Sequence, residues 1–271
     1  MHAIQLSNLI EPHKTFINTT INQLSLDSRI LGISLAGSIA TGSADQFSDI
    51  DFVISVDPNS YDEVLEDKVN IVSSIALFLT GFTGEHVGDK RLLICLYDSP
   101  LLHVDFKFVS LNDVPNETSN SCLIWQRDTR FGEALSKIRV IPQSIDFQWI
   151  EDRFWIWIHY VGTKVARGEK FEVLEFLSFI RTNVLVPLGL FEAGQSGFGV
   201  RKLEFLAPEF AQELKETVAS YDQKSLESAV KSCIRIYINL RTKIKAKGLH
   251  HHLDCQKATM DFIDSIFGSG G

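Results

Sequence analysis

The stretch "AGSIATGSADQFSDIDFVISVD", residues 36–57, contains the features that decide the fold. A small-residue turn, Gly37-Ser38, opens it, and a short polar segment leads to Asp49 and Asp51. The run from Asp49 to Val56 alternates and is rich in β-branched residues, which predicts a strand. Because side chains alternate across a strand, both aspartates face one side, roughly 7 Å apart by Cα, and the apolar residues between and after them face the core.

Two carboxylates that face the same way repel each other unless cations lie between them. Mg²⁺ takes oxygen ligands and commonly retains waters and substrate phosphates, so the pair predicts one half of a magnesium site. Asp105, in the apolar run "LLHVDFKFV", is the candidate for the other half. Adjacent strands lie about 4.8 Å apart, so a neighbouring strand would bring Asp105 within reach of the same cations. Two metal ions about 3.5 to 4 Å apart can activate an attacking oxygen and neutralise a leaving group during displacement at phosphorus.

The turn Gly37-Ser38 fits the same chemistry. Glycine lets the backbone approach a ligand closely, and Ser38 offers an N–H group and a hydroxyl at the start of an expected short helical turn. Such groups are suited to hold phosphate oxygens. Taken singly, however, the turn is also compatible with an ordinary loop, and the aspartates with a solvated strand entrance.

Together these residues resemble the signature of the DNA polymerase beta-type nucleotidyltransferase superfamily. Its pattern is a Gly-Ser turn, a spacer, a strand of the form found here as Ser48-Asp49-Ile50-Asp51-Phe52, and a distant third carboxylate, here Asp105. With a helical C-terminal half, this form is similar to small antibiotic nucleotidyltransferases that act on aminoglycosides and lincosamides. The motif covers about residues 36–109. The residues that contact the acceptor in any one subfamily are not matched, so the resemblance does not supply the acceptor.

The resemblance implies a Mg²⁺-dependent enzyme, with two ions held by Asp49 and Asp51 and a nucleoside triphosphate as co-substrate. Asp105 would complete the metal site or accept the proton of the attacking hydroxyl. Gly37, Ser38 and Ser48 would bind the nucleotide, with Ser38 at the β- or γ-phosphate. The hydroxyl of a small acceptor would attack the α-phosphorus, and pyrophosphate would leave.

Outside this stretch, strands and helices alternate up to about Val140. Helices are expected over residues 12–26, 61–79 and 129–138, strands over 30–36 and 121–128, and a loop around Gly81, Gly84 and Gly88. The turn residues Asp98-Ser99-Pro100 separate two apolar runs, 91–97 and 101–110, which predicts a hairpin.

From Ile145 onward the pattern is helical almost throughout, which predicts a bundle. Apolar residues recur at steps of three and four from Phe154 to Val165 and from Leu226 to Ile244, the second run after a predicted N-cap at Asp222 and with a predicted end at lysines and Gly248. We therefore expect an α+β chain with two domains. Residues 1–140 would form a catalytic domain with a mixed β-sheet flanked by helices, and residues 141–271 an all-α domain forming the other wall of the substrate cleft.

The composition and charge of the chain disfavour several classes of binding partner. The chain has 271 residues, 45% hydrophobic and 22% charged, with a formal net charge of −8 and no long basic block, which disfavours a broad nucleic-acid footprint. The four cysteines are scattered, which is typical of free thiols in a reducing compartment. Apolar windows such as "FWIWIHYV" are too short to span a bilayer, and no secretory signal is recognised at the N-terminus. We expect a cytoplasmic monomer or homodimer without a membrane partner.

Alternatives stay open at this point. The enzyme could instead nucleotidylate RNA or a protein side chain, or the fold could serve as a non-catalytic nucleotide-binding module. In the helical half, Glu151 is a second candidate for general base, and Glu151 and Arg201 are candidates for contacting the substrate. The run "HHHLDC", residues 250–255, does not predict a zinc site, because adjacent histidines scatter around a helix or loop and no second ligand pair follows.

Overall fold

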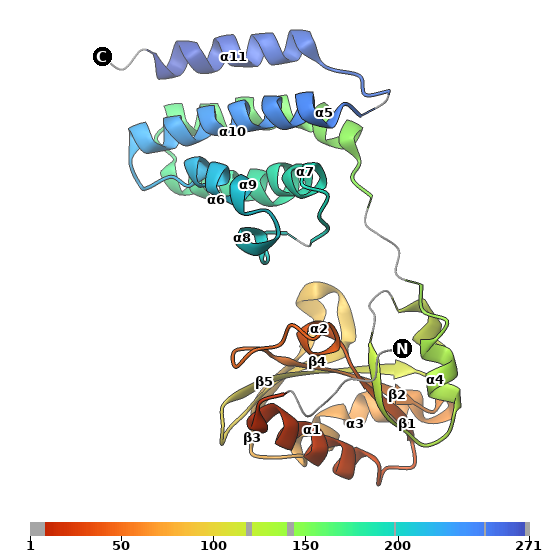
Figure 1. Cartoon of the computed structure of the whole chain (residues 1–271). Coiled ribbons are helices and arrows are strands. Elements are labelled where there is room, and N and C mark those ends of the chain that lie inside the picture. Colours follow the sequence, from red (N-terminus) through yellow and green to blue (C-terminus); the bar gives the residue numbers. More distant parts are fainter. Residues whose placement is uncertain (1–8, 118–120, 140–143, 198, 247, 269–271) are drawn as a thin grey trace. The chain divides into compact units, whose positions relative to one another are not determined.

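The structure, a computed structural model, describes residues 9–117, 121–139, 144–197, 199–246 and 248–268 (Figure 1). The chain separates into two compact units, Met1–Ile141 and Pro142–Gly271. The first contains a six-stranded sheet with flanking helices, and the second is helical. The expected α+β fold class is confirmed.

The sheet of the first unit has the strand order β3-β4-β5-β2-β1-β6. Its strands are β1 (Ile30–Leu35), β2 (Ile50–Val56), β3 (Phe78–Gly84), β4 (Asp89–Tyr97), β5 (Leu102–Ser110) and β6 (Cys122–Gln126). β2 and β5 run parallel in the centre, and every other neighbouring pair is antiparallel, so the sheet is mixed. The predicted hairpin of β4 and β5 is confirmed.

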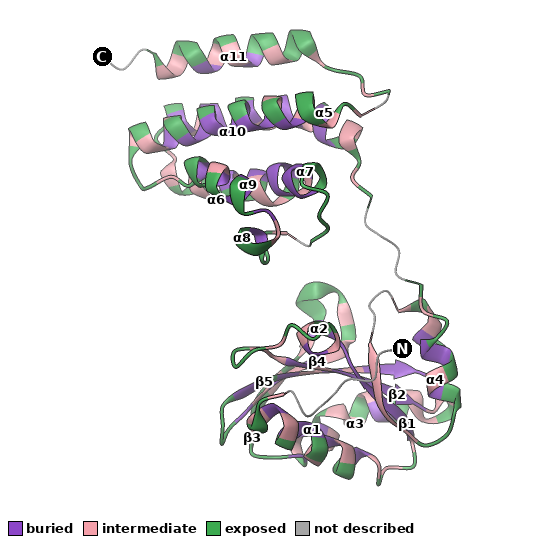
Figure 2. Ribbon diagram, in the orientation of Figure 1, coloured by how far each residue is buried: buried purple, intermediate pink, exposed green. Residues whose placement is uncertain are grey.

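One face of the sheet carries the main core of this unit. Helices α1 (Glu11–Leu24) and α3 (Tyr61–Ser73) cover it, as Figure 1 shows. Phe16 of α1 packs against Phe52 of β2, and the ring of Phe52 stacks on Phe106 of β5 at 5.1 Å between centroids. Figure 2 shows how completely the central strands are buried. The even-numbered apolar residues of β2 all point into this core, as their alternation predicts.

The opposite face has a smaller core. There, α4 (Arg130–Leu135) places Phe131 against Val53 and Val109. The short helix α2 (Gly37–Ala40) contacts β2. Asp51 and Asp105 belong to this second face, because they alternate with the buried phenylalanines Phe52 and Phe106.

The region after α3 differs from the sequence-based expectation. The helix ends at Ser73 rather than Leu79, and Phe78–Gly84 forms β3, where the glycines had predicted a loop. Gly81 pairs with Cys95 of β4, and a Cβ atom at Gly81 would lie 3.1 Å from the carbonyl oxygen of Ile94. The glycine therefore allows a close approach between two strands, a long-range requirement that local turn propensity does not reveal.

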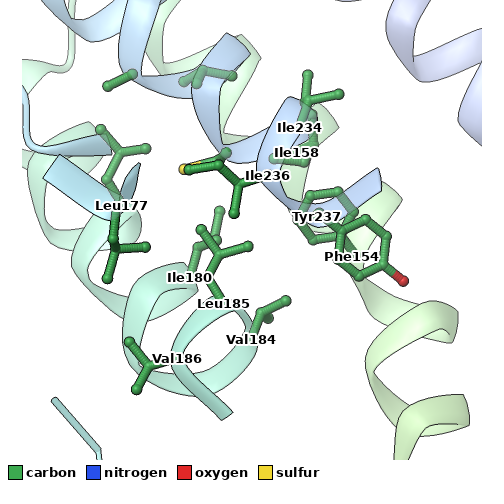
Figure 3. Close-up of a cluster of buried hydrophobic side chains, with 14 of the residues drawn as sticks. Phe154, Ile158, Leu177, Ile180, Val184, Leu185, Val186, Ile234, Ile236 and Tyr237 are labelled. Atoms are coloured by element: carbon green, nitrogen blue, oxygen red, sulfur yellow. The ribbon is translucent and has the colours of Figure 1, made fainter. Parts of the chain in front are cut away.

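The second unit consists of α5 (Phe147–Ala166), α6 (Lys170–Ile180), α7 (Val186–Glu192), α8 (Leu203–Leu206), α9 (Pro208–Leu214), α10 (Gln223–Ile244) and α11 (Leu253–Phe267). Its core is formed largely by α5, α6, α7 and α10, and Figure 3 shows Phe154 of α5 beside Tyr237 of α10. The N-cap at Asp222 is confirmed, because its side chain accepts a hydrogen bond from the Ser225 N–H at 3.1 Å. The predicted end at Gly248 is wrong, since α10 ends at Ile244 and Lys245 takes the left-handed conformation.

A π-helical turn, Arg181–Leu185, joins α6 and α7 into one run, Lys170–Glu192. By length and composition this run could cross a membrane, so the expectation that no apolar window is long enough does not hold here. Half of its most apolar window is buried, and Leu177, Ile180 and Val184 lie in the core of the unit (Figure 3). These contacts are those of a central helix in a helical bundle.

Candidate active site

Asp51 and Asp105 occupy the same register position on the parallel strands β2 and β5. Residues opposite each other on adjacent strands point to the same face, so the two carboxylates lie side by side. Both side chains are only partly exposed. The two acids are 54 positions apart in sequence, and the parallel pairing of β2 with β5 brings them together.

Asp49 lies just outside this ladder, whose first pair is Ile50 with Val104. Its charge is close enough to influence Asp105. Burial raises the pKa of the Asp105 carboxyl, the charge of Asp49 raises it further, and the neighbouring His103 opposes both; the pKa stays above its usual value. Asp49 and Asp105 are therefore electrostatically linked.

His103 is a member of the site that the sequence analysis did not identify. Its Nε2 atom lies 2.9 Å from Oδ1 of Asp105. The two residues are separated by one position on the same strand, so they share a face. The same alternation that pairs Asp49 with Asp51 was a signal that could have pointed to His103.

Gly37 lies directly against Asp51. A Cβ atom at Gly37 would come within 1.9 Å of Oδ2 of Asp51, and the φ angle of Gly37 is +59°, in the left-handed region that favours glycine. The backbone N–H of Ala36 also donates to the carbonyl oxygen of Asp51 at 2.8 Å. The turn that begins α2 is thus fixed on the carboxylate, and a side chain at residue 37 would occupy this space.

Ser38 carries a buried hydroxyl whose Oγ has no hydrogen-bond partner among the described residues. A buried polar group without a partner costs about 1–3 kcal/mol. An oxygen-rich ligand beside α2 would supply the missing partner. This orphaned hydroxyl is the observation that fits a bound phosphate group at the turn.

The loop between Ser38 and Asp49 is closed by a local hydrogen-bonded turn. The Ser48 hydroxyl accepts from the Asp45 N–H at 2.9 Å and donates to Oδ1 of Asp45 at 3.2 Å. The Ser43 N–H donates to the carbonyl oxygen of Ser38 at 2.9 Å. The side chain of Ser48 therefore shapes the loop, whereas its assignment to nucleotide binding stays a prediction.

The acids suit Mg²⁺ in chemistry, because this ion prefers carboxylate oxygens and usually keeps several waters. Within the described residues, no group of three His, Cys, Asp or Glu side chains is arranged to hold a metal ion. The carboxylates are instead related in pairs, Asp51 with Asp105 by register and Asp49 with Asp105 by charge. Assigning Asp49, Asp51 and Asp105 to a metal is accordingly a proposal.

Glu151 lies inside the helical unit and is almost fully buried. Its carboxylate accepts hydrogen bonds from the Tyr237 hydroxyl, from Nη1 of Arg241 at 3.0 Å and from the backbone N–H of His252 at 3.1 Å. These contacts join α5, α10 and the segment before α11. A carboxylate engaged in this way supports the fold of the helical unit, and the assignment of Glu151 as a base or substrate contact stays a prediction.

Arg201 is exposed, in the turn that precedes α8. It belongs to the helical unit, whereas β2 and β5 belong to the first unit. Its assignment to substrate binding stays a prediction.

Residues 17–115 match the family model of the nucleotidyltransferase domain. This segment contains every candidate residue of the first unit named above. No curated protein matches the chain.

Among solved structures, an aminoglycoside 6-adenyltransferase from Bacillus subtilis is similar, with 15% identity, a TM-score of 0.42 and coverage of 96% of this chain and 100% of that one. A nucleotidyltransferase-like protein from Exiguobacterium sibiricum has 10% identity and a TM-score of 0.34, covering 94% of this chain and 88% of that one. Both TM-scores lie below 0.5, so neither likeness carries an argument about this chain.

Proposed function

We propose that this chain, whose first unit is a nucleotidyltransferase domain, transfers a nucleoside monophosphate from a nucleoside triphosphate to a hydroxyl group of a small molecule. The observation that carries the proposal is the position of Asp51. This carboxylate shares a register with Asp105 on one side and contacts the Gly37 turn on the other. Acids for catalysis and a turn suited to phosphate thus meet at one residue.

Asp49 and Asp51 would hold Mg²⁺, with two ions as the resemblance implies. Asp105 would complete the metal site or accept the proton of the acceptor hydroxyl. When bound, Mg²⁺ would neutralise the charge of the triphosphate and of the departing pyrophosphate. Gly37 leaves room beside Asp51, and the Ser38 hydroxyl would donate to an oxygen of the β- or γ-phosphate. The protein's contribution is chiefly to position the triphosphate and to provide compensating charge.

In the second of these roles, Asp105 would accept the proton of the acceptor hydroxyl during the transfer. The hydroxyl oxygen forms a bond to the α-phosphorus, and the bond from the α-phosphorus to the bridging oxygen of the β-phosphate breaks. Pyrophosphate leaves with the electron pair of that bond.

The acceptor that we propose is a small hydroxylated molecule of the antibiotic type, such as an aminoglycoside or a lincosamide. The net charge of −8 favours a cationic acceptor, which the field of an acidic protein attracts. We also propose a cytoplasmic location, which the free cysteines Cys95, Cys122, Cys233 and Cys255 support.

Mass spectrometry tests the proposal directly. The protein is incubated with Mg²⁺, isotopically labelled nucleoside triphosphates and pools of small hydroxylated acceptors, including aminoglycosides and lincosamides. We expect one acceptor to gain the mass of a labelled nucleotide, with release of pyrophosphate. Labelling of RNA or of the protein itself would instead favour nucleotidylation of a macromolecule, and nucleotide binding without any product would favour a non-catalytic module.

A further inference from the structure

His13 of α1 is buried, with 2% of its surface exposed, although it lies in the first turn of the helix. Its Nε2 atom lies 2.7 Å from the carbonyl oxygen of Ser48, 35 positions later in the chain. Because a carbonyl oxygen only accepts hydrogen bonds, Nε2 must carry the proton. The ring therefore donates to the peptide group that immediately precedes Asp49.

The other ring nitrogen, Nδ1, is buried and has no hydrogen-bond partner among the described residues. An unpaired buried nitrogen is unfavourable, so a histidine that served only to fill space would be a poor choice at this position. An apolar side chain would fill the same volume without that cost. What the histidine provides, and an apolar residue does not, is the bond to Ser48.

The significance of this bond follows from how the two aspartates are held. Asp51 lies within the ladder of β2 and β5, so its backbone is fixed by paired strands. Asp49 precedes the first pair of that ladder and has no such support. The side chain of Ser48 is held by the turn with Asp45, and its carbonyl group, which belongs to the peptide before Asp49, is held by His13.

We propose that His13 is a positioning residue, which fixes the backbone at Asp49 through the carbonyl of Ser48 and so holds the Asp49 carboxylate in the active site. This rests on the proposed function, in which Asp49 binds the metal–nucleotide complex. The hydrogen bond thus joins the first turn of α1 to the backbone that carries a charge at the start of β2.

Two substitutions distinguish the effect of the hydrogen bond from the effect of burying a side chain at residue 13. In His13→Gln the amide nitrogen can reach about as far from the backbone as Nε2 does, and it retains a donor. In His13→Asn the side chain is one methylene shorter than that of glutamine, so its amide nitrogen does not reach the carbonyl oxygen of Ser48. Phe16→Leu is the control, because it weakens the packing of α1 without removing the donor.

Two measurements are made on the full chain. The first is amide hydrogen exchange over residues 43–50 in the nucleotide-free protein. The second is calorimetric affinity for Mg²⁺ with a non-hydrolysable α,β-methylene triphosphate. We expect His13→Asn to accelerate exchange and to weaken affinity by about tenfold or more, as for lost outer-shell support of a metal ligand. His13→Gln should resemble the wild type in both, and Phe16→Leu should lower the melting temperature while leaving the affinity unchanged.

Equal affinities for His13→Asn and His13→Gln would overturn the positioning role, even if exchange increased. So would a loss of affinity in Phe16→Leu as large as that in His13→Asn, because the effect would then follow stability. Should His13→Asn not fold, a clear loss of affinity in His13→Gln at unchanged exchange would equally contradict the proposal, and a retained affinity would support it. A wild-type protein that binds no Mg²⁺–triphosphate complex would instead refute the proposed function, whatever the variants do.

Discussion

The α-carbon of Gly37 faces the carboxylate of Asp51 so closely that a methyl group there would lie 1.9 Å from Oδ2. The glycine is also in the left-handed conformation. Any side chain at residue 37 is therefore unfavourable for two separate reasons, the left-handed backbone conformation and the steric clash with the Asp51 carboxylate. They can be distinguished, because Gly42 in the same loop is left-handed as well, with φ of +70°, but a Cβ there would meet nothing within 4 Å.

We expect Gly37→Ala to displace the Asp51 carboxylate and to reduce nucleotide transfer at least about tenfold, in addition to the roughly 1–2 kcal/mol that a left-handed non-glycine residue costs. Gly42→Ala should show only the second effect. Initial rates of transfer and melting temperatures of both variants check this. Equal losses of activity in the two variants would show that contact with Asp51 is unimportant.

Asp51→Asn retains the size of the side chain but removes the charge. We expect it to reduce transfer by at least about a hundredfold, the range seen when a group that acts on the reacting atoms is lost. Asp57→Asn is the matched control, since Asp57 follows the other end of β2 and its side chain caps a short helix. Pyrophosphate release under saturating Mg²⁺ measures both, and unimpaired turnover in Asp51→Asn is incompatible with the proposed metal role.

Ser38→Ala should affect stability and binding in opposite directions. Removing a buried hydroxyl without a partner should leave the free energy of unfolding unchanged or raise it by up to about 1 kcal/mol. Losing a donor to a charged phosphate should weaken triphosphate affinity by about 1.5 kcal/mol, or more than tenfold. Denaturant unfolding and calorimetry test the two halves. A variant that is less stable but binds the triphosphate as well as the wild type would show that the hydroxyl has a structural partner and no ligand.

Glu151→Gln is expected to destabilise the helical unit by about 3–5 kcal/mol at neutral pH, because it removes the charge of a buried carboxylate and leaves the half-buried Arg241 without its charged partner. Burial alone would raise the pKa of Glu151, but the hydrogen bond from Tyr237 and the charge of Arg241 outweigh it, and the pKa lies below its usual value. A lowered pKa means that the ionised form is favoured by folding. Its contribution is complete above the pKa of the unfolded chain and is lost as the pH falls through the folded one.

Unfolding measurements of the wild type and Glu151→Gln between neutral and acidic pH therefore should converge on the acid side. Gln148→Ala, which alters a polar contact on the exposed side of the same helix, serves as the control. If the free energies of unfolding of the wild type and Glu151→Gln differed by the same amount at every pH, the stabilisation would come from the packing of the side chain and not from its charge.

Much of the first unit could be predicted from local pattern. The alternation in "DIDFVISV" fixed which residues enter the core, and the turn at Asp98-Ser99-Pro100 marked the hairpin of β4 and β5. These features depend on contacts between residues close in sequence. β3 could not be predicted in the same way, because Gly81 is strand-forming only through its pairing with Cys95.

Glu151 shows where prediction from local sequence fails for a charged residue. In sequence it opens an aromatic helix and is compatible with a surface carboxylate, whereas in the fold Tyr237 and Arg241, more than 80 positions later, enclose it. The bond between His13 and Ser48 is likewise invisible in the sequence, because nothing local indicates that the start of α1 meets the start of β2.

The sequence by itself determined that Asp51 and Asp105 lie on strands whose alternate residues enter the apolar core, since a period of two residues is a property of the strand alone. Only the tertiary structure decided that β2 and β5 are parallel neighbours in register, which sets Asp51 beside Asp105. Strand order and register depend on packing α1 and α3 across the sheet, and that packing joins residues too far apart in the chain for any local pattern to specify.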